Sequence, residues 1–201
     1  MIYLAYHRII DNNSAISSDY DIPFPELKKH IQFDHNSSLN NIRFTFDDGN
    51  CSDLKVAEEL TKYGLSGTFF IITGNIGCSK FLTQTDIKYI PKLGHTIGSH
   101  SDTHLSFQKL SDTATLEELK YSKNKLEEIL GVPVKDFAFP GGKFFKKHID
   151  IAKSMGYENI FTSDELPFHA YGSSRMHVRM SNITKFQAIV EKNFSYYCVG
   201  Q

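Results

Sequence analysis

Residues 42–49 read Ile-Arg-Phe-Thr-Phe-Asp-Asp-Gly, and the interpretation of the whole chain starts from this stretch. Apolar side chains occupy every second position from Ile42 to Phe46, which predicts a short buried strand that the following glycine ends. Successive strand side chains face opposite sides, so Asp47 and Asp48 can take different tasks around one centre, one binding a cation and the other moving a proton. An Asp-rich turn in which Asp47 caps the next helix is an equally simple interpretation.

The composition describes an ordinary globular chain. Its 201 residues fit one domain, and we expect a single domain over residues 1–201. Hydrophobic residues make up 40% and charged residues 22%, as in soluble globular proteins. The net charge of −1 gives no indication of a nucleic-acid partner. Three cysteines are too few and too scattered for a disulfide framework or a Cys-type zinc site.

The chain shows no pattern of a targeting or membrane segment. Residues 1–8 lack a charged leader and a long apolar run, so we expect no signal peptide. No stretch approaches the roughly 20 apolar residues that a membrane span needs. These observations favour a cytoplasmic location and no membrane span, and they leave the oligomeric state open.

Seven strand-like segments alternate with helical segments. The expected strands cover residues 2–6, 42–46, 67–73, 95–98, 136–139, 159–162 and 176–180. The expected helices cover residues 25–31, 54–63, 87–93, 114–130, 147–155 and 184–193, with Ser52, Thr83 or Thr85, and Asp112 or Thr113 as N-caps. The leucines of the 114–130 helix are expected in the core, and residues 10–22 are expected to form an exposed loop. This alternation predicts an α/β fold with a parallel sheet, whose carboxyl edge is where sites assemble.

Two histidines follow one of these strands. His100 and His104 are four residues apart, so a helical turn would place both imidazoles on one face, within reach of a single cation. Two neutral imidazoles and a carboxylate make a three-ligand site with open positions, which is typical of a catalytic metal. Alone, the pair is more often two surface or capping histidines. Together with the two aspartates after another strand, it becomes a specific signal.

These motifs resemble those of a known family. Thr45-Phe46-Asp47-Asp48-Gly49 and His100-Ser101-Asp102-Thr103-His104 closely resemble the first two motifs of the polysaccharide deacetylases, carbohydrate esterase family 4 with its NodB homology domain. Residues 137–142, Phe-Ala-Phe-Pro-Gly-Gly, are similar to the third. The motifs occur in the family's order, and the resemblance spans roughly residues 2–180.

The resemblance implies a fold, an activity and a set of roles. The fold would be a single-domain distorted (β/α) barrel of about seven parallel strands, and the activity metal-assisted removal of an acetyl group from a sugar. Asp48, His100 and His104 would hold a divalent cation, by implication zinc. Asp47 would act as general base on the attacking water. The backbone N–H of Gly141 is our candidate donor to the oxyanion, and the neighbouring Pro140 and Gly142 would line the substrate site.

The later motifs depart from the family pattern. The arginine that precedes the proline of the longer third motif, and that orients the aspartate, is absent. Arg175 and His177 lie on the last expected strand, similar to shorter family members. By alternation they share a face, so Arg175 is a candidate partner for the aspartate and His177 a candidate acid. A structural arginine and a solvated histidine are an equally good interpretation. Asp164 is only a loose match to the fourth motif, and the chain has no Trp. His7, at the end of the first strand, is a candidate substrate contact or a rim histidine.

We therefore expect a metal-dependent N-deacetylase acting on an acetylated amino sugar. A sugar nucleotide, a lipid-linked sugar or a small glycoside fits a cytoplasmic enzyme better than an extracellular polymer. Two alternatives remain open: a sugar-binding or scaffolding homologue whose catalysis is impaired, and a different metal hydrolase such as a phosphoesterase.

Overall fold

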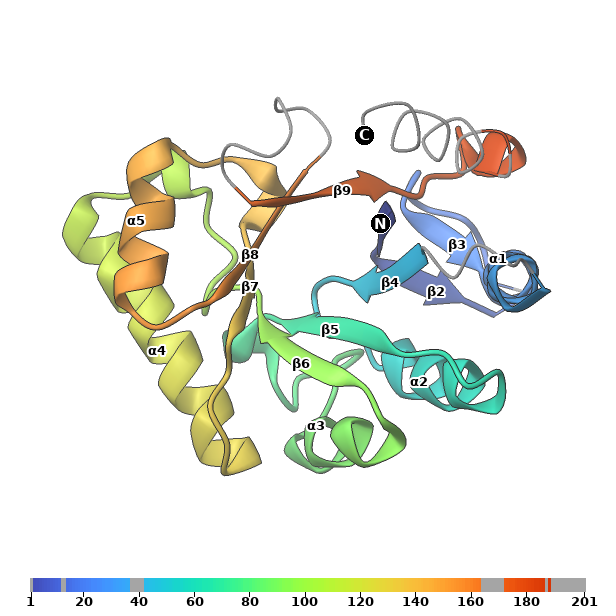
Figure 1. Ribbon diagram of the computed structural model, residues 1–201, viewed down its shortest axis with the longest axis horizontal. Coiled ribbons are helices and arrows are strands. Elements are labelled where there is room, and N and C mark those ends of the chain that lie inside the picture. The colour runs from blue at the N-terminus through green and yellow to red at the C-terminus, as the bar shows by residue number, and fades with distance from the viewer. Residues whose placement is uncertain (1, 12–13, 37–41, 164–171, 187, 189–201) are drawn as a thin grey trace, which may run out of the picture.

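Seven parallel strands close into a barrel in the computed structural model, which describes residues 2–11, 14–36, 42–163, 172–186 and 188 (Figure 1). The strands follow one another around the barrel in chain order: β1 (Ile2–Tyr6), β4 (Ile42–Phe46), β5 (Gly67–Ile71), β6 (Thr96–Ser99), β7 (Asp136–Ala138), β8 (Asn159–Ser163) and β9 (Ser173–His177). β9 pairs with β1 and completes the ring. The expected barrel of seven parallel strands is confirmed.

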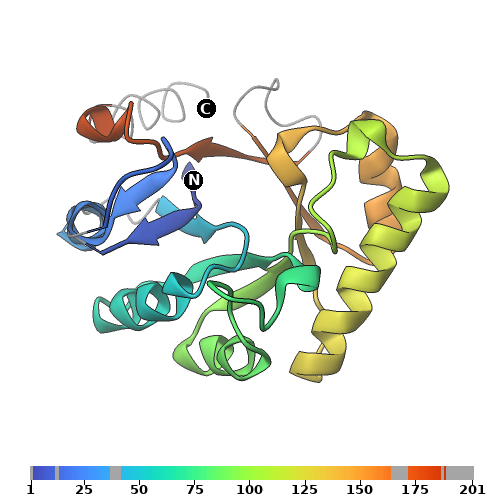
Figure 2. The same ribbon diagram turned by 180° about the vertical axis from the view of Figure 1, so that it is seen from behind.

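The helices lie on the outside of this barrel (Figures 1 and 2). They are α1 (Phe24–Asn36), α2 (Ser52–Lys62), α3 (Gln84–Tyr89), α4 (Asp112–Leu130) and α5 (Lys146–Ser154), with short 3₁₀ turns η1 (Thr73–Asn75), η2 (Ile90–Leu93), η3 (Phe107–Lys109), η4 (Pro140–Gly142) and η5 (Ile183–Lys185). α4 packs against both α3 and α5. Among the described residues, no helix is both long and apolar enough to cross a bilayer.

Alternation along the strands divides their side chains into two sets. Residues such as Phe46 and Phe69, whose rings stack 4.9 Å apart, belong to the large core between the barrel and its helices. The other set faces inward and forms a small cluster of Phe70, Ala138 and Phe161. Gly98 belongs to the inner set, because a Cβ there would lie 2.5 Å from the Phe70 ring. Apolar side chains, two of them aromatic, thus fill the inside of the barrel, and polar side chains occupy its interior near the carboxyl ends of the strands.

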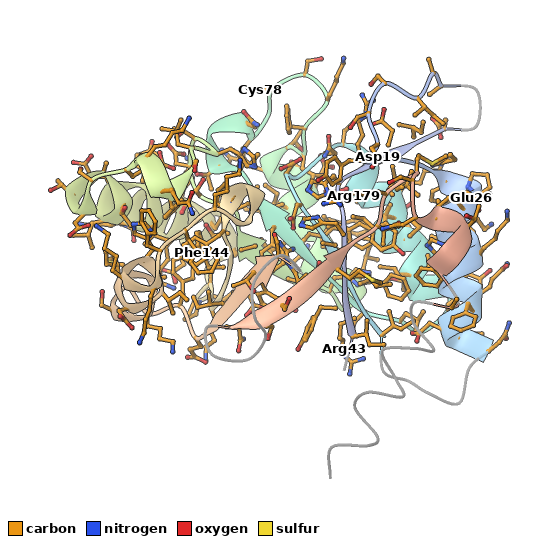
Figure 3. All side chains as sticks on the ribbon, turned by 90° about the horizontal axis from the view of Figure 1, so that it is seen from above. Asp19, Glu26, Arg43, Cys78, Phe144 and Arg179 are labelled. Carbon is orange, nitrogen blue, oxygen red and sulfur yellow. The ribbon has the colours of Figure 1, made fainter. Side chains whose placement is uncertain are left out.

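The loops that follow the strands gather at one end of the barrel. Cys78, in the loop after β5, and Arg43, at the start of β4, lie at opposite edges of the molecule in Figure 3. All seven strands run in the same direction, so His7, Asp47 and His100, which follow three of them, share the end on which Cys78 lies. This is the carboxyl end, where the polar clusters are expected.

Several boundaries differ from expectation. Residues 10–22 are not only a loop: β2 (Arg8–Ile10) and β3 (Asp21–Pro23) form a small parallel sheet, tied by the Arg8–Asp21 ion pair. α1 is longer than expected. β9 covers residues 173–177, whereas the last strand was expected over residues 176–180. The expected helix over 184–193 lies mostly outside the described residues, as does Asp164.

The helix caps and the α4 core face also differ from expectation. The N-cap position of α2 is Cys51 and not Ser52, and no side chain caps that end. Ser111 caps α4 by accepting the N–H of Ala114, so the expected caps Asp112 and Thr113 are wrong. Thr83 caps α3 as expected. Leu116 of α4 is 40% exposed and so is not a core residue.

Candidate metal centre and its aspartate

The end of β4 separates the two aspartates. Asp47 continues the strand, donates its backbone N–H to the Tyr6 carbonyl at 2.8 Å, and is 1% exposed. Asp48 has a left-handed backbone, with φ at +78°. The backbone therefore leaves the strand conformation at Asp48, and Gly49 continues the turn at φ +75°. Both carboxylates face His100 Nε2, from 3.8 Å for Asp47 Oδ2 and 3.7 Å for Asp48 Oδ1, so the two acids lie around one centre because of a turn after the strand and not because of strand alternation alone.

The two histidines come from a loop and not from a helical turn. Residues 100–106 after β6 form bends and extended backbone, with Ser101 and His104 at φ +65° and +60°. Ser101 Oγ accepts the backbone N–H of His104 at 3.0 Å, which closes the loop. The helical turn expected from the spacing is wrong, yet the imidazoles do lie together, with ring centroids 5.0 Å apart.

Neighbouring elements hold this loop in place. Glu118 of α4 accepts the backbone N–H groups of Asp102 and Thr103 at 3.0 and 2.9 Å, and the Asp102 carboxylate accepts the Thr73 hydroxyl at 2.6 Å. Strained left-handed residues persist where their surroundings fix them. Of the four non-glycine residues with positive φ in the described part of the chain, three (Asp48, Ser101 and His104) belong to this site.

Asp48, His100 and His104 bring three ligand atoms together. His100 Nε2 and His104 Nε2 lie 3.7 and 3.6 Å from Asp48 Oδ1, and all three atoms lie within 4.8 Å of one another. The His100 Nδ1–H donates to the Ala138 carbonyl at 2.8 Å, which leaves its Nε2 lone pair directed to the cluster. Asp48 Oδ1 is buried and has no hydrogen-bond partner among the residues that the structure describes. An orphaned carboxylate oxygen between two imidazole nitrogens fits a divalent cation.

The pKa values of Asp48, His100 and His104 are also consistent with a cation site. Burial, together with the nearby Asp47, raises the pKa of Asp48 to about 7. Burial lowers the pKa of His100 to about 3 and also lowers that of His104. Both imidazoles are therefore neutral near pH 7, the form that binds metals. The Asp48 carboxylate is buried beside the Asp47 carboxylate, and a bound cation would relieve the repulsion between them.

Arg175 lies against Asp47. Its Nη1 donates to Asp47 Oδ1 at 2.5 Å and its Nη2 to Oδ2 at 2.8 Å, a two-point contact with both groups about 1% exposed. Burial raises the pKa of Asp47, but the charge of Arg175 and the nearby His100 and His7 more than offset this, so the pKa lies well below its usual value. The structure thus brings together the pair that strand alternation permitted, and Thr45 Oγ1 accepts a further bond from Arg175 at 3.2 Å.

His177 and His7 flank this pair. His177 is 7% exposed, so the interpretation as a solvated histidine is wrong; its Nε2 lies 3.0 Å from Ser163 Oγ. Its ring stacks on that of His7 with centroids 5.2 Å apart, and Tyr20 packs against both rings. His7 Nε2 lies 4.0 Å from Asp47 Oδ2, and burial lowers the pKa of His7 to about 4.

The Pro140–Gly142 turn follows β7, the strand whose Ala138 carbonyl accepts the hydrogen bond from His100. It begins two residues after Ala138, whose carbonyl holds His100. Pro140 is buried, and Gly141 is exposed at the tip with φ +57°. Gly142, at φ +63°, packs so closely on β8 that a Cβ would meet Ser163 Oγ at 2.2 Å.

The two glycines of this turn should respond differently to alanine. Gly142→Ala is expected to cost about 2–4 kcal/mol of unfolding free energy, because left-handed backbone strain adds to a clash with Ser163. Gly141→Ala, with nothing within 4 Å of its Cβ, should cost only about 1–2 kcal/mol. Urea denaturation of both variants measures the difference. Equal losses would mean that Ser163 moves aside freely.

A closed parallel barrel that gathers an acid–imidazole cluster at its carboxyl end is the architecture of many barrel enzymes, whose sites form at that end. The family described as polysaccharide deacetylase matches residues 35–160, which is more than half of the chain. The chain belongs to the polysaccharide deacetylase family.

Individual relatives resemble the chain in sequence, and a solved structure resembles it in fold. The chain is 24% identical over 182 residues to the Bacillus subtilis (strain 168) protein YxkH, which carries a provisional polysaccharide deacetylase name; the match covers 80% of this chain and 63% of that one. It is 30% identical over 124 residues to a peptidoglycan-N-acetylglucosamine deacetylase of Bacillus cereus, covering 61% and 56%. The crystal structure of BC0361, a polysaccharide deacetylase from Bacillus cereus, superposes with a TM-score of 0.79 at 22% identity and covers 93% and 67%. The chain thus spans less than two thirds of the length of the curated relatives that it matches.

Proposed function

We propose that this protein is a metal-dependent hydrolase that removes the N-acetyl group from an acetylated amino sugar. The observation that carries the proposal is the buried, partnerless Asp48 Oδ1 between two neutral imidazole nitrogens, with an arginine-held aspartate beside it. Membership of the polysaccharide deacetylase family supports the reaction class. A related Bacillus cereus protein named as a peptidoglycan-N-acetylglucosamine deacetylase supports the choice of sugar.

Asp48, His100 and His104 would hold the cation. One carboxylate and two imidazoles suit zinc, and three protein ligands leave open positions. A divalent cation at such a site lowers the pKa of water and polarises a carbonyl oxygen. The ligand residues contribute by staying in their metal-binding protonation states, since burial keeps both imidazoles neutral.

Asp47 is assigned as the general base. It lies beside the cluster, with its Oδ2 3.8 Å from His100 Nε2, and its low pKa keeps it ionised, so that an acceptor oxygen is present for the proton of the attacking water. Arg175 is assigned as a positioning residue, because its two-point contact fixes the orientation of the carboxylate.

The remaining roles follow from position. His177, buried beside the pair, would return a proton to the amine that leaves. The N–H of Gly141 would donate to the oxyanion, since this residue is exposed at the tip of the turn next to the His100 partner. His7, Pro140 and Gly142 would form the wall against which the acetyl group lies.

Metal analysis combined with acetate release tests this function. We expect about one zinc ion per chain, acetate release from N-acetylglucosamine oligomers, loss of turnover after chelation, and recovery when zinc is returned. A metal content near two ions per chain with release of phosphate would favour a phosphoesterase. A loaded protein that releases no acetate from any acetylated amino sugar would indicate a binding homologue and overturn the proposal.

A further inference from the structure

A pocket of about 320 Å³ is lined in part by residues that follow His7 and Asp48 closely in the chain. It is lined by residues from β2, from the start of α2 and from the loop after β5, among them Arg8, Lys55 and Lys80. We call it the basic pocket. Its volume falls at the lower end of the range for small-molecule sites. None of its lining residues is used in the proposed hydrolysis.

The chain places the basic pocket close to the reacting groups. Arg8 directly follows His7, whose Nε2 is 4.0 Å from Asp47 Oδ2. Asn50, another lining residue, follows Asp48 by two positions, so their Cα atoms are at most about 7.6 Å apart. The pocket lining is therefore adjacent in the chain to both candidate site aspartates and to His7.

The pocket lining has an excess of basic side chains. Arg8, Lys55 and Lys80 line it together with Asp11, and two of these three cations already have an acidic partner, Arg8 in Asp21 and Lys55 in Asp11. The Lys55–Asp11 ion pair is exposed on both sides, at 53% and 78%, and such pairs exchange readily with a ligand. Lys80 makes no ion pair with any residue that the structure describes. Asp21 holds Arg8 from outside the pocket lining and fixes its orientation.

The start of α2 adds to this positive field. This helix has 11 residues, and no side chain caps its N-terminus. Ser52, in its first turn, lines the pocket, and its Oγ is buried without a hydrogen-bond partner. An uncapped helix N-terminus beside cationic side chains is the arrangement that binds phosphate groups. Asp53, the acid of the same turn, has no exposed surface, and burial raises its pKa well above the usual value.

We propose that the basic pocket binds a phosphoryl group of the substrate, so that the enzyme acts on an acetylated amino sugar carrying a phosphate or diphosphate. This inference rests on the proposed deacetylation and names its substrate class. Ile9 supplies an apolar wall for the adjoining sugar ring, and Lys55, whose ammonium lies 4.3 Å over the Phe24 ring, binds the anion together with Lys80 and the end of α2.

Kinetics on matched substrates test the proposal. For the native enzyme we expect kcat/KM for N-acetylglucosamine 1-phosphate to exceed that for N-acetylglucosamine by tenfold or more, and the preference to shrink at high salt. In the double variant Lys55→Gln/Lys80→Gln, this ratio should fall by about tenfold. Lys153→Gln, which removes an exposed charge at the far end of α5, should leave the ratio unchanged. Equal kcat/KM values in the native enzyme, or an unchanged ratio in the double variant, would overturn the inference while leaving deacetylation intact.

Binding separates a failure of this inference from a failure of the proposed function. The Kd of N-acetylglucosamine 1-phosphate, measured by calorimetry on the zinc-loaded protein, should rise by about tenfold in the double variant and stay constant in Lys153→Gln. If the protein releases no acetate but its Kd still shows this shift, the phosphate site is supported and the proposed deacetylation is contradicted. An unchanged Kd would mean that the phosphate binds elsewhere, for instance at the metal.

The same assay distinguishes two sources of the phosphate. UDP-N-acetylglucosamine carries its diphosphate on a nucleoside, and a short-chain prenyl diphosphate-linked N-acetylglucosamine carries it on a lipid. Both keep the phosphate next to the sugar, so both should outperform the neutral sugar, and the better of the two identifies the carrier. If neither is deacetylated faster than N-acetylglucosamine, the phosphate subsite is excluded.

Discussion

Asp47→Asn should keep its metal and lose turnover, with kcat falling by about 10²- to 10⁴-fold. The three ligand atoms belong to other residues, so metal content measured by atomic emission should match the native protein. Asparagine retains one acceptor for Arg175 but cannot take a proton from water. Acetate release under saturating substrate measures the loss in kcat.

Asp48→Asn is the matched control for this variant, because it changes the neighbouring acid in the same way. It removes the carboxylate that faces both imidazoles, so this variant should lose metal affinity and turnover together. Undiminished kcat in Asp47→Asn would remove Asp47 from the role of base. Loss of metal in Asp47→Asn would instead make Asp47 part of the ligand set.

Arg175→Met should destabilise the protein by about 3–5 kcal/mol and also lower turnover. The change leaves the Asp47 carboxylate buried and without its two-point partner, and breaking a buried ion pair from one side costs this much. Urea denaturation at pH 7 measures the loss. Arg43→Met, an exposed arginine on β4, should change the unfolding free energy by no more than about 0.5 kcal/mol.

The pH dependence of stability should change as well. In the native protein the pKa of Asp47 is lowered on folding, so the pair stabilises the fold above about pH 4, the unfolded pKa, and this contribution is lost as the pH falls below it. Without Arg175, burial alone raises the pKa of Asp47, so the loss of stability in Arg175→Met relative to the native protein should grow as the pH rises from 4 towards neutrality. A stability difference between the two proteins that stays constant over this range would show that Arg175 does not control the ionisation of Asp47.

The fold and the metal cluster were largely predictable because their signals are local. Each barrel strand is a short apolar run between turn residues, and chain order alone arranges such strands in a parallel barrel. The residues 45–49 and 100–104 carry the ligand chemistry in two compact segments. The loop geometry was not predictable, because His104 is placed by the left-handed Ser101 and by Glu118, which lies in a separate helix.

Other features depend on contacts between distant segments. Arg175 and Asp47 are 128 residues apart in the sequence. Strand alternation made their contact possible but could not predict it. The small sheet of β2 and β3 has three residues in each strand and depends on Arg8 reaching Asp21, so it leaves no periodic pattern. Helical periodicity placed Leu116 in the core, yet α4 turns that position outward at its first turn.

The ring of strands also constrains the order in which the barrel can close during synthesis. β1 is hydrogen-bonded on one side to β4 and on the other to β9, so within this barrel the strand made earliest waits for the one made last. Until then one edge of β1 is exposed, Asp47 lacks its guanidinium, and the chain is open to pairing with other strands. Such distant pairing is slow to form, so a nascent chain would carry Asp48, His100 and His104 well before Asp47 meets Arg175.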